Sequence, residues 1–184
     1  MYTNTFPIML RKALHALLAV MFVGLAMYTS QTALYAVLLI LACVFLLTLR
    51  FGAFDPIRRA ELASFGELFY VLGIFGTAVL FLPGAPIAFT AGVLVLGFAD
   101  TAAALIGRQW GKQTYTIFGE RRSYLGSTTA LVVSAVILAS FGVPIWYALL
   151  GGWLLATIEA LMPRGSDNLA LPIVAAMLVS LLAV

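Results

Sequence analysis

The sequence predicts an all-α, polytopic membrane helix bundle, and three observations lead to this fold class. Of the 184 residues, 64% are hydrophobic and only 9% are charged, whereas a soluble domain has roughly a quarter charged residues. The apolar residues form about seven runs, each near the length of one membrane span. The charged residues gather at the N-terminal end and at or near alternate connections between these runs. This pattern excludes a soluble enzyme, a nucleic-acid-binding domain, a disordered tail and a coiled coil.

The predicted spans are separated by turn signals or by charged stretches. They cover residues 12–28, 33–49, 67–82, 87–106, 127–141, 145–161 and the remainder of the chain after residue 168. Pro83 and Pro86 mark a tight turn, because neither has the backbone N–H that a helix needs. Seven spans take about 140 residues, which leaves only short loops. We therefore expect residues 1–184 to form a single integral membrane domain.

Charge placement predicts the orientation of this bundle. All ten Lys and Arg and all seven Asp and Glu lie at the N-terminal end or on the side of the bundle where spans two and three, four and five, and six and seven are connected. Since Lys and Arg favour the cytoplasmic side, the N-terminus is expected in the cytoplasm and the C-terminus outside. The functional residues then face the cytoplasm from the cytoplasmic membrane. The net charge of +3 fits basic loops rather than a nucleic-acid surface, so no nucleic-acid partner is expected.

Two carboxylates fall within predicted spans. Asp100 lies about two helical turns before Gly107, a little below the cytoplasmic surface. An ionised carboxylate there costs a few kcal/mol unless it is paired or binds a cation. Asp100 is therefore either one half of an ion pair with a loop arginine or a ligand of a metal. Glu159 lies one turn before Pro163, at the end of the sixth span, and is also partly within the membrane.

Three more polar residues lie at the starts of predicted spans. Asp167 and Asn168 open the seventh, where both residue types also serve as helix N-caps. Glu67 opens the third, where a carboxylate interacts favourably with the helix dipole. Both the structural and the functional interpretation stay open for these residues.

The only histidine shares a helix face with two cations. His15 follows Arg11 and Lys12 by one turn, just inside the first predicted span. A lone histidine is usually a satisfied structural group. A neutral imidazole in this position could instead accept a proton or contact a phosphate.

Residues 107–126 form the most highly charged connection. Basic side chains with Gly and Ser, facing carboxylates, suit a polyphosphate that is held together with a divalent metal. The alternative is that these cations only set the topology. The sequence has no P-loop, dinucleotide fingerprint, CxxC or HExxH motif. One His and one Cys make a nucleophilic triad implausible.

Four stretches in the same order resemble the motifs of the polyprenol kinase family. They are residues 11–15 (RKALH), 97–108 (GFADTAAALIGR) with Gly111 and Lys112, 122–127 (RSYLGS), and Glu159 with 165–169 (GSDNL) and Pro172. This family includes dolichol kinase, phytol kinase and CTP-dependent diacylglycerol kinase, and it is related to phosphatidate cytidylyltransferase. Two positions depart from its pattern. Arg122 stands where lysine is usual, and Leu125 stands where glutamate is common, so that the role of this carboxylate is dispensable or passes to Glu120 or Glu67.

The resemblance implies a CTP-dependent kinase that transfers a phosphoryl group to a lipid alcohol such as phytol, a polyprenol or dolichol, with Mg²⁺ as cofactor. The residues that it implies as catalytic are His15, Asp100, Glu159 and Asp167, of which Asp100, Asp167 and Glu159 hold the metal. The residues expected to contact the nucleotide or its phosphates are Arg11, Lys12, Arg108, Lys112, Arg121, Arg122, Ser123, Gly126, Ser127 and Asn168.

Two other functions remain open at this level. A phosphatidate cytidylyltransferase-like enzyme would use the same metal and cations but make a CDP-lipid. A small membrane transporter or scaffold would need no metal site at all. The kinase is favoured because residues 11–15 and 167–169 resemble that branch more closely. Ion coupling is disfavoured because no ionisable residue lies near the middle of a span.

Overall fold

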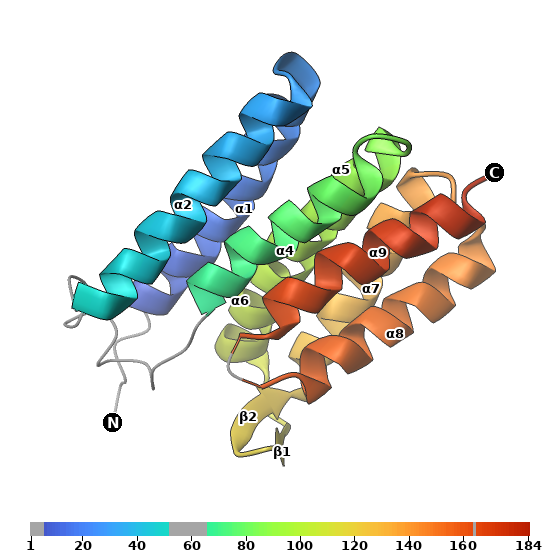
Figure 1. The fold of residues 1–184 in the computed structure, drawn as a ribbon. Coiled ribbons are helices and arrows are strands. Elements are labelled where there is room, and N and C mark those ends of the chain that lie inside the picture. Colours follow the sequence, from blue (N-terminus) through green and yellow to red (C-terminus); the bar gives the residue numbers. More distant parts are fainter. Residues whose placement is uncertain (1–5, 52–65, 164) are drawn as a thin grey trace.

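The protein is a bundle of helices that lie side by side, with a β-hairpin at one end (Figure 1). The computed structural model describes residues 6–51, 66–163 and 165–184. The elements in these ranges are α1 (Phe6–Tyr28), α2 (Gln31–Phe51), α4 (Gly66–Phe81), α5 (Pro86–Leu94), η1 (Val95–Ala99), α6 (Asp100–Trp110), β1 (Thr114–Ile117), β2 (Glu120–Ser123), α7 (Tyr124–Ser140), α8 (Ile145–Leu161) and α9 (Asp167–Leu182).

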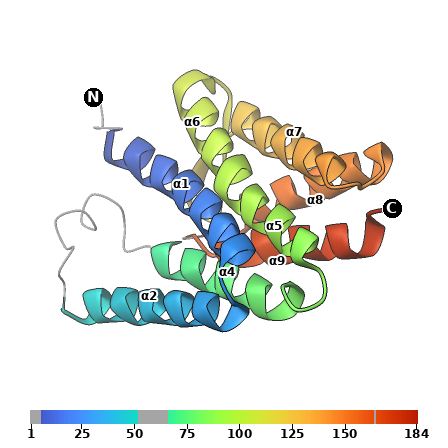
Figure 2. The ribbon, with the colours of Figure 1, turned by 90° about the horizontal axis from the view of Figure 1, so that it is seen from above.

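One long helix runs through the middle of the bundle, between α1 and α7 (Figure 2). It consists of α5, the π-helical turn η1 and α6, and it begins with Pro86 at a position where a missing N–H costs nothing. At Gly97 this helix approaches α1 so closely that a Cβ would lie 2.3 Å from the Cβ of Ala19. The contact places the start of α1 beside the start of α6.

Two apolar clusters hold the bundle together. One joins α1, α2, α4 and α5 through side chains such as Phe22, Leu38 and Ile74. The other joins α5, α7, α8 and α9 through side chains such as Leu138 and Leu155. Both clusters include residues of α5, so the central helix ties the two halves together.

The connection between α6 and α7 differs from the predicted loop over residues 107–126. Helix α6 continues to Trp110, α7 begins at Tyr124, and strands β1 and β2 pair antiparallel between them. The hairpin turns at Phe118 and Gly119, which both have positive φ (49° and 82°), as a two-residue hairpin turn requires. The all-α prediction is therefore confirmed for this mostly helical chain, and the two-stranded hairpin is a local departure from the predicted loop.

The described charged residues gather at one end of the bundle. Arg11 and Lys12 lie near the start of α1, the hairpin follows α6, Glu159 ends α8 and Asp167 begins α9. The uncharged turns after α1, α4 and α7 lie at the opposite end, where α9 also ends (Figure 1). The charged residues between 52 and 65, and Arg164, lie outside the described residues.

Within the described residues, two helices are long and apolar enough to cross a membrane, namely Met9–Tyr28 and Pro86–Trp110. The shorter apolar helices are Gln31–Leu47, Gly66–Phe81, Tyr124–Ser140, Ile145–Leu161 and Asp167–Leu182. Many large apolar side chains are exposed, including Leu17, Trp146 and Leu150. Together these features support a membrane protein. The number of spans and the side that faces the cytoplasm stay predictions.

The close contact between α1 and the central helix predicts that Gly97→Ala destabilises the fold. The added methyl group meets Ala19, whose Cβ cannot rotate away, so we expect a loss of about 1–3 kcal/mol from overpacking. Gly24→Ala on α1 is the matched control, because a Cβ there meets no atom within 4 Å. This control should be neutral or gain up to about 1 kcal/mol of helix stability. Thermal unfolding in detergent measures both variants, and equal midpoints would contradict the predicted contact.

Candidate active site

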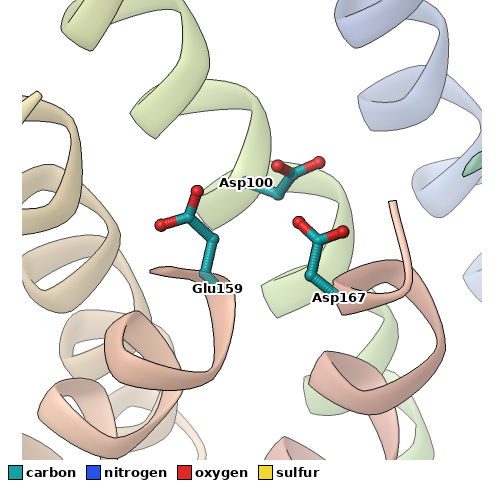
Figure 3. A group of neighbouring side chains, drawn as sticks. All are labelled: Asp100, Glu159 and Asp167. Carbon is teal, nitrogen blue, oxygen red and sulfur yellow. The ribbon is translucent and has the colours of Figure 1, made fainter. Parts of the chain in front are cut away.

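Three carboxylates from three helices meet at the charged end of the bundle. Asp100 begins α6, Glu159 lies in the last turn of α8, and Asp167 begins α9. One carboxylate oxygen of each lies within 4.8 Å of one from each of the others. Their side chains point toward one another (Figure 3). Asp100 is 3% exposed and Asp167 is 6% exposed, so this carboxylate cluster is largely shielded from water.

The local sequence explains how the carboxylates come together. Helix α8 ends two residues after Glu159, and a short connection turns the chain back into α9 at Asp167. Gly165 has a φ of +80° in this connection, and a Cβ there would lie 2.7 Å from the Cα of Gly66. Asp100 follows directly after the π-helical turn η1. Turns of this kind occur often at functional sites.

Asp167 does not act as a helix cap. The N-cap of α9 is Ser166, and no side chain makes a capping hydrogen bond there. Among the residues that the structure describes, no Lys, Arg or His nitrogen lies within 4.0 Å of the Asp167 carboxylate. The neighbouring Asn168 donates from Nδ2 to the Gly66 carbonyl at 2.9 Å, which fastens α9 to α4. The buried Asp167 side chain therefore has no cationic partner in the described part of the chain that explains its place in the carboxylate cluster.

Lys12 of α1 makes an ion pair with Asp100. The expected partner in the structural interpretation was an arginine of a loop, whereas the observed partner comes from the first helix. The Thr101 hydroxyl donates to the Lys12 carbonyl at 2.9 Å and so fixes the backbone of α1 beside α6. Burial of Asp100 is thus compensated by a cation from a distant part of the sequence.

Arg122 of β2 makes an ion pair with Glu159. Its guanidinium also donates to Glu120 at 3.1 Å and to the Met162 carbonyl at 3.2 Å. Burial opposes the charge of Arg122, but Glu159, Asp167 and Glu120 outweigh this effect and raise its pKa. The hairpin therefore delivers a permanent positive charge to the carboxylate cluster.

His15 lies one turn along α1 from Lys12 and is buried. Its ring stacks on Tyr70 with a centroid distance of 4.3 Å, and the Tyr70 hydroxyl donates to the His15 carbonyl. The buried Nδ1 of His15 has no hydrogen-bond partner among the described residues. Arg11 lies nearer the start of the helix and pairs with Glu67 at 3.4 Å.

The other predicted contact residues lie around the hairpin, and several already have partners. Arg121 points away from Arg122, as strand alternation requires, and donates to Thr114 at 3.2 Å. Ser123 caps α7 by accepting from the Gly126 amide at 3.0 Å. The remaining predicted residues are Ser127, whose hydroxyl contacts that of Tyr115, and Arg108 and Lys112, which are exposed. The structure does not bring Arg121 to the carboxylate cluster, and the nucleotide contacts of all these residues stay predictions.

Sequence reasoning missed three contributors to the site. Tyr70 positions His15, Thr101 positions Lys12 and the hairpin positions Arg122, yet none of these three contributors was predicted. The hairpin had a detectable signal, since β-branched and aromatic residues alternate over 114–117 before a Gly at the turn. Tyr70 and Thr101 had none, because their contacts join residues far apart in the chain.

The donor set of this site fits a hard divalent cation. Three carboxylate oxygens within 4.8 Å of one another match the oxygen ligands that Mg²⁺ prefers. Asp167, which is buried and pairs with no cation among residues 6–51, 66–163 and 165–184, is the side chain that such a cation would satisfy. Lys12 and Arg122, which pair with Asp100 and Glu159, add positive charge of the kind that binds phosphates.

Two curated proteins are similar to this chain. Phytol kinase of Synechocystis sp. is 34% identical over 125 residues, which cover 62% of this chain and 53% of that protein. CTP-dependent diacylglycerol kinase 1 of Schizosaccharomyces pombe is 30% identical over 134 residues, which cover 64% of this chain and 60% of that protein. The chain thus matches only about half to three-fifths of the length of these relatives. No protein-family model matches the chain, and no solved structure matches it significantly.

The ion pair between Arg122 and Glu159 predicts a difference between two neighbouring arginines. Arg122→Met leaves the largely buried Glu159 without its cation, so we expect a loss of about 3 kcal/mol. Arg121→Met removes an exposed charge and should stay within about 0.5 kcal/mol of the wild type. Denaturant or thermal unfolding in detergent compares the two. Similar losses from both variants would contradict the assigned geometry.

Proposed function

We propose that this chain, whose resemblance to the polyprenol kinase family the two relatives confirm, is a lipid-alcohol kinase that uses CTP and an isoprenoid alcohol. The observation that carries the proposal is the buried carboxylate cluster with a cation on each side. Phosphoryl transfer needs charge stabilisation and positioning more than covalent chemistry. The similarity to a phytol kinase and to a CTP-dependent diacylglycerol kinase supports the acceptor class and the donor.

Asp100, Glu159 and Asp167 would hold Mg²⁺ in this proposal. The metal, when bound, neutralises negative charge on the phosphates. Arg122 and Lys12 lie at the cluster itself. Arg108 in the last turn of α6 and Lys112 between α6 and β1 are exposed and suit the outer phosphates and the nucleotide. The site would therefore receive CTP from the end of the bundle where the charged residues gather.

His15 would orient the hydroxyl of the lipid acceptor. Its buried Nδ1 has no partner among the described residues, and the stacked Tyr70 ring keeps the imidazole in place. The lipid would approach from the bilayer, because the sides of the bundle expose large apolar side chains. We extend the proposal to a seven-span chain with this end in the cytoplasm, where CTP is present and the hydroxyl of a membrane lipid lies at the surface.

In this proposal Glu120 takes the role of the glutamate that the family commonly has at the position of Leu125. Leu125, at the position where the family commonly has glutamate, is exposed in the first turn of α7. Glu120 accepts from Arg122, which also pairs with Glu159. One guanidinium thus links Glu120 to the carboxylate cluster.

A labelling assay tests the activity. The purified protein in detergent receives Mg²⁺ with γ-labelled CTP or ATP, and phytol, a polyprenol, diacylglycerol and phosphatidate are offered separately. We expect label in an isoprenoid alcohol with CTP as the better donor. Asp100→Asn should reduce the rate of label transfer at least 100-fold, because a single electrostatic contact to developing charge contributes a factor on the order of 10²–10³ to the rate. Thr90→Val is the matched control on the same long helix, since the Thr90 hydroxyl donates to the Pro86 carbonyl one turn earlier in an exposed hydrogen bond.

Two results of this assay would overturn the kinase. Pyrophosphate and a CDP-lipid formed from phosphatidate would identify a cytidylyltransferase. No product from any acceptor, with protein that unfolds at its normal temperature, would favour a transporter or scaffold.

The metal site makes a separate prediction. Asp167→Asn and Glu159→Gln each remove one charged ligand, so the Mg²⁺ concentration for half-maximal activity should rise about tenfold or more, an effect as large as the loss of an outer-shell partner. Thr157→Val, on the same helix as Glu159, should leave it unchanged because this hydroxyl bonds the carbonyl of Trp153. A titration of activity with Mg²⁺ after chelation measures the shift. Unchanged Mg²⁺ dependence in both carboxylate variants would exclude them as ligands.

A further inference from the structure

The two cations at the carboxylate cluster are held very differently. Arg122 donates to Glu159, to Glu120 and to the Met162 carbonyl, so three acceptors fix its guanidinium. The ammonium of Lys12 has a single acceptor among the described residues, the carboxylate of Asp100. A lysine is a point charge on a flexible four-carbon stem, whereas a guanidinium in several hydrogen bonds is rigid. Lys12 is therefore the cation that can move.

The backbone that carries Lys12 stays in place when its side chain moves. The Thr101 hydroxyl donates to the Lys12 carbonyl, and the Tyr70 hydroxyl donates to the His15 carbonyl one turn later. Gly97 brings the central helix into contact with Ala19 of α1. With α1 fixed at these three points, the ammonium can leave Asp100 by side-chain rotation alone.

Charge repulsion makes this movement favourable when a metal binds. The ammonium of Lys12 pairs with the Asp100 carboxylate, which is also a proposed ligand of the metal. A divalent cation bound by Asp100 would lie close to this ammonium in a buried site, where like charges repel strongly. Asp167, which is buried and pairs with no cation in the described part of the chain, gives the metal its first ligand. The phosphates of a nucleotide then offer the displaced ammonium a new partner.

We propose that Lys12 is an exchangeable counter-ion. Its ammonium pairs with Asp100 while the site holds no metal, and it pairs with the nucleotide phosphates when the metal binds. This inference rests on the proposed metal site and adds a function for Lys12 within it. Its consequence is ordered loading: the metal binds weakly alone and tightly together with a nucleotide, because only the nucleotide gives Lys12 a second acceptor.

Lysine labelling tests the exchange directly. The chain has two lysines, Lys12 and Lys112. The Lys12 side chain is 12% exposed and Lys112 is exposed, so Lys112 serves as an internal reference. The protein is acetylated without metal, with Mg²⁺, and with Mg²⁺ and a non-hydrolysable CTP analogue, and both sites are quantified by mass spectrometry. We expect Lys12 to label several-fold faster with Mg²⁺ alone and slowly again with the analogue, while Mg²⁺ alone leaves Lys112 unchanged.

Mn²⁺ binding without nucleotide separates the two proposals, with electron paramagnetic resonance as the readout. Lys12→Met should bind Mn²⁺ about tenfold more tightly than wild type, Lys12→Arg should not, and Asp100→Asn should bind more weakly. The exchange is wrong if Lys12→Met binds Mn²⁺ no more tightly than the wild type and the rate of Lys12 acetylation does not change with Mg²⁺. The metal site is still supported in that case, provided that the wild type binds Mn²⁺ and Asp100→Asn does not. If neither wild type nor Lys12→Met binds Mn²⁺, the metal site fails, and the exchange fails with it.

Discussion

The structure depends on the burial of three like charges at one point in an apolar bundle. Asp100, Glu159 and Asp167 repel one another and lose the solvation that water would give them. Such a cluster is stable only when cations reach it, and the chain supplies them from two distant elements, α1 and β2. The packing of α1 against the central helix and the folding of the hairpin are therefore coupled to the carboxylates. The charged end of the bundle assembles as one unit.

The sequence predicts the helices well because their signals are local. The start of α8 at Ile145, its end at Leu161 and the turn at Pro83 follow from apolar runs and from proline, which need no knowledge of the rest of the chain. The prediction over residues 107–126 was wrong because charge density was taken as the sign of a loop. The alternating strand pattern in the same residues carried the better information.

The site was predictable in its members but not in its pairings. Asp100 could be singled out because an unpaired carboxylate within an apolar run is costly. Its partner Lys12 is 88 residues away in sequence, and no local pattern connects two such positions. The same holds for Arg122, which was assigned to phosphates but contacts Glu159. Charge identifies the residues of an ionic cluster, whereas only the packing of helices decides which of them meet.

The π-helical turn η1 has a consequence for how the protein tolerates change in length. Such a turn holds one residue more than the α-helical turn it replaces, and it lies directly before Asp100. Deletion of a single residue within Val95–Ala99 would let the remaining residues form a regular α-helical turn, and the helix beyond it would face nearly the same way. If all five residues instead adopted α-helical geometry, Asp100 would rotate by about 100° away from α8 and α9, although the helix itself would remain intact and apolar. The extra residue of the π-helical turn thus determines which way Asp100 faces.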